Sequence, residues 1–191
     1  TLVQLPEHNT LFEFVPGYQS SFPIQFGYMP ISDYELTFTN IFDEKVITKI
    51  TLEDQAINKV KICPDTLARP LTQNALSKLQ EGDSLVIEFN SAGCFHFEDF
   101  TLTIVRTKES YLARLYDTYL TEEFEVSDKR FVASVKLDST QLLTFRKFEN
   151  ELNLIKTGGG CTSRDHYEIT SKYLNLTKTD DGCNWNGFYN L

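Results

Sequence analysis

Positive charge is scarce in this sequence: 18 lysines and arginines stand against 27 aspartates and glutamates, for a formal net charge of −9. A protein that binds nucleic acid needs a concentration of lysine and arginine to neutralise phosphates. No such concentration is evident, so the composition argues against nucleic acid as a partner and disfavours anionic membrane surfaces. The acidic balance favours a soluble protein whose partner, if it has one, is a basic protein.

Long hydrophobic runs are missing as well. No apolar stretch approaches the roughly 20 residues that a transmembrane helix needs, so no transmembrane segment is predicted. No signal peptide is recognisable, but the chain opens at Thr1 rather than at methionine, which is typical of a trimmed mature form or an expressed fragment. At 41% hydrophobic residues, the chain is still apolar enough to fold around a core.

Residues for acid–base and metal chemistry are few, because the chain has only three histidines, His8, His96 and His166. The Gly-x-Ser-x-Gly motif of serine hydrolases does not occur. The triple glycine at 158–160 follows an expected helix, whereas a phosphate-binding loop follows a strand and opens a helix. These absences predict a non-enzymatic protein without a cofactor.

Two weaker interpretations retain some chemistry. Four side chains offer zinc-binding atoms, although their spacing fits no common zinc motif: Cys94, His96, Cys161 and His166. Cys94 with either of these histidines also offers a thiol nucleophile and a base. Because nothing nearby marks Cys94 as activated, a buried or bridged sulfur is the simpler interpretation. A small Cys/His hydrolase or metalloprotein is therefore a subordinate hypothesis.

The four cysteines suggest a disulfide. Cys161 and Cys183 flank an expected hairpin, so they form the predicted pair. Cys63 and Cys94 either pair with each other or stay as buried thiols. A disulfide favours a secreted, periplasmic or cell-surface location, although four cysteines do not exclude the cytoplasm.

What the chain does have is a strong β pattern. Residues 1–33 are rich in proline, which predicts edge strands and loops. Residues 34–137 contain several alternating runs joined by short turns, which predicts an antiparallel sheet. The clearest run, 34–39, places Tyr34, Leu36 and Phe38 on one face and forms an expected hairpin with 46–52.

One long helix is predicted from its own residues. Asp138 and Gln141 form a capping-box pattern at its start, and apolar residues recur at three- and four-residue spacing as far as Ile155. Residues 138–157 are the expected helix, and the glycines after it are the expected end. A shorter helix is expected between Thr72 and Gly82. The last segment, 158–191, is expected to form a hairpin from strands 167–170 and 173–176.

The predicted fold is therefore a β-rich α+β single domain over residues 1–191. Its sheet is mostly antiparallel, as a sandwich or an open barrel-like sheet. One long amphipathic helix packs on it, and a disulfide ties the C-terminal hairpin.

The predicted function is binding of another protein, possibly a basic one, in an inhibitor-like or immunity-like role. Glu122, Glu123 and Glu125 form an acidic cluster that would steer such a partner. The alternative is a carbohydrate- or ligand-binding module that uses Trp185, Phe188 and Tyr189. The same aromatic cluster is also interpreted as a core plug, since a lone tryptophan is usually largely buried. The sequence leaves the oligomeric state open.

Overall fold

The structure is a computed structural model. It describes residues 2–4, 11–13, 29–54, 58–60, 67–68, 70–72, 74–118, 128–157, 159–182 and 185–191. The chain forms two compact units, Thr1–Pro70 and Leu71–Leu191. The boundaries expected from the sequence lie after residues 33, 137 and 157, and the division at Pro70 is not among them. That the two units fold together as one domain stays a prediction.

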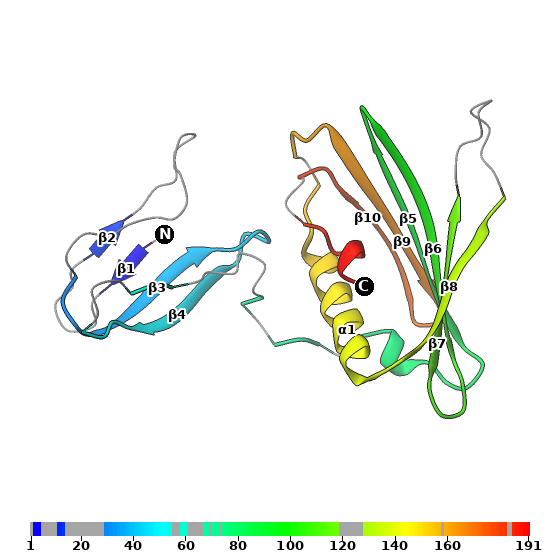
Figure 1. Ribbon diagram of the computed structural model, residues 1–191, viewed down its shortest axis with the longest axis horizontal. Coiled ribbons are helices and arrows are strands. Elements are labelled where there is room, and N and C mark those ends of the chain that lie inside the picture. Colours follow the sequence, from blue (N-terminus) through cyan, green and yellow to red (C-terminus); the bar gives the residue numbers. More distant parts are fainter. Residues whose placement is uncertain are drawn as a thin grey trace. The chain divides into compact units, whose positions relative to one another are not determined.

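The first unit contains a four-stranded antiparallel sheet in the order β2-β1-β3-β4 (Figure 1). Its strands are β1 (Leu2–Gln4), β2 (Leu11–Glu13), β3 (Asp33–Thr39) and β4 (Lys45–Thr51). The expected β3–β4 hairpin is confirmed, and Tyr34 and Leu36 are buried at the centre of its apolar face. At the turn, the Asn40 side-chain oxygen accepts the backbone N–H groups of Phe42 and Glu44 at 3.0 and 2.8 Å.

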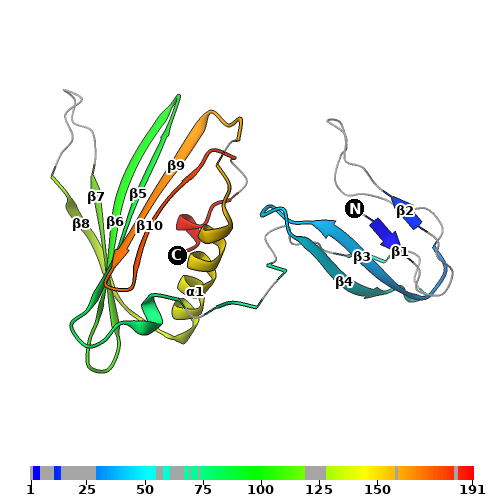
Figure 2. The same cartoon turned by 180° about the vertical axis from the view of Figure 1, so that it is seen from behind.

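The second unit contains a six-stranded antiparallel sheet in the order β10-β9-β5-β6-β7-β8 (Figures 1 and 2). Its strands are β5 (Ser84–Gly93), β6 (His96–Arg106), β7 (Tyr111–Thr118), β8 (Arg130–Leu137), β9 (Ser163–Ser171) and β10 (Leu174–Asp180). The described strands form two separate open sheets and no closed barrel.

In the six-stranded sheet, some strands pair with their neighbours in the sequence and others pair with distant strands. Strands β5 to β8 follow one another as an antiparallel meander, as expected. The C-terminal hairpin of β9 and β10 is also confirmed, and it returns to pair with the first strand of the meander, β5. This return makes β5 a central strand, which explains why Leu85, Ile87 and Phe89 are completely buried or nearly so.

Helix α1 (Ser139–Leu154) packs on one face of this sheet (Figure 1). The capping box is present: Asp138 accepts the backbone N–H of Gln141 at 2.8 Å, and the Gln141 side chain accepts the backbone N–H of Asp138 at 2.9 Å. Phe145, Phe148 and Leu152 form the buried side of the expected stripe. The helix ends at a C-cap on Ile155, before the glycines.

The helix does not cover the whole sheet. In both overall views α1 lies on the side of β9 and β10, and β7 and β8 extend away from it (Figures 1 and 2). Strand β8 is the edge of the sheet, and every residue in it except Leu137 is exposed. The alternation of apolar residues in β8 would suggest, on its own, that one face of the strand packs on a core. In the structure neither face of β8 does so.

The region after Thr72 differs from its prediction. Only one 3-10 turn forms there, η1 (Leu76–Lys78), and Ala75 rather than Thr72 caps it. The Thr72 hydroxyl instead donates to the Asn150 side chain on α1 at 2.7 Å. Tertiary contacts with the helix thus decide the conformation of this segment. No described helix combines the length and apolar character needed to cross a membrane.

Candidate functional site

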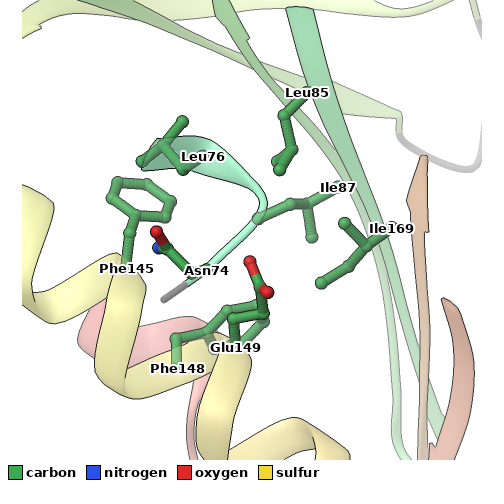
Figure 3. Close-up of a pocket in the computed structure, with 8 residues that line it drawn as sticks. All are labelled: Asn74, Leu76, Leu85, Ile87, Phe145, Phe148, Glu149 and Ile169. Carbon is green, nitrogen blue, oxygen red and sulfur yellow. The ribbon is translucent and has the colours of Figure 1, made fainter. Parts of the chain in front are cut away.

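Among the described residues of the second unit, a cavity lies between η1, α1 and the sheet, and it is too small to hold a ligand. Its volume is about 10 Å³, which is the least that one water needs. Figure 3 shows the Glu149 carboxylate directed into this space. The backbone N–H of Ala75 donates to both Glu149 oxygens at 3.0 and 2.9 Å, and burial raises the pKa of this carboxyl. The hydrogen bonds give this glutamate a structural role at the start of η1.

The second cavity has a volume of about 220 Å³, and polar side chains and two aromatic residues line it. It lies where β5, β6, β9 and β10 approach the C-terminal segment after β10. Its lining residues are Ser91, His96, Ser163, Asp165, Asp180, Trp185, Asn186 and Tyr189. Ser91 lies directly opposite Asp165, and Asp165 directly opposite Asp180, so the three side chains share one face of the sheet. Since Ser91 is two residues after Phe89, this is the face that carries the core.

Ser91 is the centre of the hydrogen bonds in this cavity. It is only 2% exposed, and its hydroxyl donates to Asp165 Oδ1 at 2.6 Å. The same oxygen lies 2.9 Å from Nε2 of His96. A hydroxyl has one proton, so Ser91 can only accept from the imidazole, which assigns the proton to Nε2. A nucleophilic serine needs the reverse order, in which the imidazole takes the serine proton and the carboxylate orients the imidazole. The arrangement therefore lacks a catalytic relay.

Gly93 explains how His96 reaches this position. The two residues are directly opposite each other next to the turn between β5 and β6. A Cβ atom on residue 93 would lie 2.5 Å from Cε1 of His96 and 2.9 Å from the Ser163 hydroxyl. Glycine leaves room for the imidazole over the backbone here, and a larger residue would force the His96 ring and the Ser163 hydroxyl to shift.

The cavity is acidic. Asp180 is 7% exposed, and its Oδ1 accepts the backbone N–H of Gly182 at 2.8 Å. Loss of hydration raises the pKa of Asp180, and the nearby carboxylates of Asp165 and Asp181 raise it further. No lysine or arginine is among the lining residues that the structure describes. The closest candidate by sequence, Lys178, donates to the carbonyl oxygens of residues 153 and 155 at the end of α1.

Asp165 is held by two hydroxyl groups from the core face. Besides Ser91, the phenol of Tyr167 points to its Oδ2 at 3.5 Å. Tyr167 is completely buried, and its pKa is raised mainly by burial and then by Asp165 and Asp180. This phenol therefore stays protonated and remains a donor toward the carboxylate.

The C-terminal aromatic residues divide between core and rim. Trp185 is 4% exposed, donates from Nε1 to Glu151 at 2.8 Å, and stacks on Phe148 with ring centroids 5.5 Å apart. Phe188, in the 3-10 turn η2 (Phe188–Asn190), is also buried. Tyr189 is exposed at the cavity rim and donates to Glu98. The described geometry thus agrees with the core-plug interpretation for Trp185 and Phe188, although Trp185 is also among the residues that line the cavity.

The structure does not bring the sequence-predicted cysteine and histidine sets together. Cys94 is an exposed free thiol rather than a buried or bridged one, and His96 bonds to Ser91 rather than to this thiol. His166 lies on the opposite face of β9 from Asp165 and contacts Thr179 through Nδ1 at 3.2 Å. Within the described ranges, no group of three or more His, Cys, Asp or Glu residues is arranged to hold a metal ion.

Three other predicted features lie partly or wholly outside the described residues. Cys63 and Cys183 are outside them, so the structure does not show the Cys161–Cys183 disulfide, which stays a prediction. The backbone N–H of Cys161 does donate to the carbonyl of Asp181 at 3.0 Å, two positions before Cys183. The acidic cluster of residues 122, 123 and 125 is also outside the described chain.

Sequence reasoning missed the residues at the heart of the cavity, namely Ser91, Asp165 and Asp180. For the last two, the predicted strands 167–170 and 173–176 placed the turn at 171–172. The structure places it at 172–173, and this register pairs residue 165 with residue 180. No local signal identifies Ser91, whose place depends on pairing between β5 and β9 across 74 residues of sequence.

Replacing Asp180 with asparagine tests the electrostatic state of the cavity. The folded-state pKa of Asp180 is raised, so the folded protein holds this proton more tightly than the unfolded chain does. Stability is therefore lost as the pH rises through the folded-state pKa. Asparagine keeps the acceptor for Gly182 without the charge, so Asp180→Asn should raise the Tm at pH 7 by a few degrees. The gain should shrink below about pH 4, the ordinary range of an aspartate. Thermal unfolding of both proteins across the pH range measures the Tm gain at pH 7 and its decrease at low pH. An unchanged or lower Tm at pH 7 would contradict the argument.

Comparison with family models, with curated proteins and with solved structures finds no match to this chain.

Proposed function

We propose that this is a non-enzymatic binding protein that engages a basic protein partner outside the cytoplasm, in an inhibitor-like or immunity-like role. One observation carries the proposal: the larger cavity combines two carboxylates with a hydrogen-bond order that is wrong for catalysis. An acidic, partly aromatic surface without a reaction centre is suited to recognition. The net charge of −9 supports the same conclusion, because it would attract a cationic partner from a distance.

The location outside the cytoplasm rests on the predicted Cys161–Cys183 pair. Mass mapping of peptides from the non-reduced protein tests it directly. A cross-linked peptide containing both residues is the expected result, and free thiols at both positions would remove the support.

Ligand binding by the aromatic cluster remains the second candidate. Trp185 lines the cavity and Tyr189 is exposed at its rim, so a small molecule has an aromatic surface to contact there. A cysteine-based hydrolase has no such support from the described geometry, since His96 bonds to Ser91 and not to Cys94.

The test uses a lysine- and arginine-rich peptide and a counterpart with glutamate at the same positions. We expect the basic peptide to bind at low salt, with an affinity that falls steeply as salt is added, while the acidic peptide does not bind. Reversing Glu122, Glu123 and Glu125 to lysine should lower the association rate. The matched control reverses three exposed acids elsewhere and so changes the net charge equally: Asp54, Glu81 and Glu109. Binding that is insensitive to salt, or equal losses in both triple variants, would contradict a specific role for the cluster.

A further inference from the structure

We infer that the larger cavity binds one organic cation, an alkylammonium or guanidinium group. The inference rests on the proposed function and deepens it, because it names the chemical group that the acidic site recognises. It depends on three features of the described residues. Asp180 is a buried carboxylate without a cationic partner among them, Asp165 is a second carboxylate directly opposite it, and aromatic side chains line the cavity.

Asp180 is the strongest of these features. It is more than nine-tenths buried and lines the cavity, yet only its Oδ1 has a hydrogen-bond partner among the described residues, the N–H of Gly182. Its Oδ2 has none there, and no described ion pair involves this residue. Removing a carboxylate from water is costly unless it is paired, and buried carboxylates usually have a cationic partner. The cavity in front of Asp180 provides the space for one.

Asp165 supplies the second carboxylate. It lies directly across from Asp180 in the β9–β10 register, and two like charges in such a pair destabilise a sheet. The hydroxyls of Ser91 and Tyr167 fix its orientation at 2.6 and 3.5 Å. A cation placed between the two carboxylates would offset their repulsion and replace the lost hydration of both. The pair is thus a preorganised acceptor for N–H donors.

The rest of the lining favours an organic cation. Trp185 and Tyr189 provide aromatic rings, and such rings attract ammonium and guanidinium groups. The bond from Tyr189 to Glu98 restrains the ring at the rim. The volume of about 220 Å³ is far above the least that one water needs, so the cavity has room for a small amine or for one side chain.

Trp185 provides a direct reporter, because it is the only tryptophan in the chain. The probe is butylguanidinium, and butylurea is a neutral molecule of nearly the same shape. We expect butylguanidinium to change the tryptophan fluorescence in a saturable manner and butylurea to have no such effect. An equal response to both would overturn the inference, since the recognition would then not depend on charge.

Two variants test the proposed residues. Asp165→Asn and Asp180→Asn should each weaken butylguanidinium binding at least tenfold. Glu109→Gln removes one charge from an exposed position and should leave the affinity unchanged. The higher Tm expected for Asp180→Asn separates loss of the site from loss of the fold. Unchanged binding in both aspartate variants, or an equal loss in Glu109→Gln, would overturn the inference.

Competition identifies the source of the cation. If the lysine- and arginine-rich peptide displaces butylguanidinium, the site takes a side chain of a protein partner. If it does not, the site takes a free amine or guanidine, and the cation site stands in either case. The proposed function can fail while the cavity inference stands. If the basic peptide does not bind but butylguanidinium does, only the proposed function is overturned. Conversely, peptide binding that survives both aspartate variants, with no butylguanidinium response, overturns only the cavity inference.

Discussion

Replacing Phe89 with alanine should destabilise the second unit by about 3–5 kcal/mol, the usual cost of removing a large buried aromatic side chain. Phe89 has no exposed surface and is in the central strand β5. Its ring stacks on Phe188 at a centroid distance of 4.3 Å and contacts Tyr167 at 5.1 Å. Alanine would leave a cavity where these rings meet, and the neighbouring strands prevent the sheet from closing it.

Denaturant unfolding of the variant and the unchanged protein measures this difference. The control is Phe95→Ala on the turn of the same hairpin, where the side chain is fully exposed. It should change the free energy of unfolding by less than about 0.5 kcal/mol. If Phe89→Ala is unfolded from the start, Phe89→Leu gives a measurable intermediate. Equal effects at positions 89 and 95 would show that the packing around β5 is described wrongly.

A methyl group at position 187 should destabilise the protein by about 1–3 kcal/mol through overpacking. Gly187 has φ −58° and ψ −42°, a conformation that alanine adopts without strain. The cost comes from contact, because a Cβ there would lie 2.0 Å from Cζ2 of Trp185. The indole has little freedom to move, since it stacks on Phe148 and bonds to Glu151.

Gly160→Ala is the matched control for Gly187→Ala. No atom lies within 4 Å of a Cβ built on residue 160, so this change should be close to neutral. Denaturant unfolding compares the two variants, and near-ultraviolet circular dichroism reports the displacement of the indole. A stability loss at 160 as large as at 187 would contradict the argument, because the loss would then not depend on the indole contact. The entropic effect of replacing glycine with alanine is itself stabilising.

The elements predicted from the sequence are those whose signals are local. The capping box of α1 joins Asp138 and Gln141, three positions apart, and the structure contains it. Strands β3 and β4 pair through a short turn, so their alternation and the turn together fix the register. The segment after Thr72 departs from its prediction because contacts with Asn150, 78 residues away, replace the expected cap.

Burial was less predictable than secondary structure. Strand β8 alternates like a core strand, but it forms the sheet edge, and Val135 is nearly half exposed. The alternating pattern reports that a strand has two different faces; it does not report whether another element covers either of them. Coverage depends on the position of α1, which reaches the β9–β10 side of the sheet (Figure 2).

The sequence by itself determined the β-rich character, the antiparallel meander, the helix with its cap and the C-terminal hairpin, because each depends on residues close together in the chain. Only the tertiary structure decided that Ser91 bonds to Asp165 and that Asp180 lines the same cavity. The reason is that β9 pairs not only with its sequence neighbour β10 but also with the distant strand β5, and such long-range pairing depends on the whole core and leaves no local pattern. That pairing brings Ser91 and Asp165 together in the cavity.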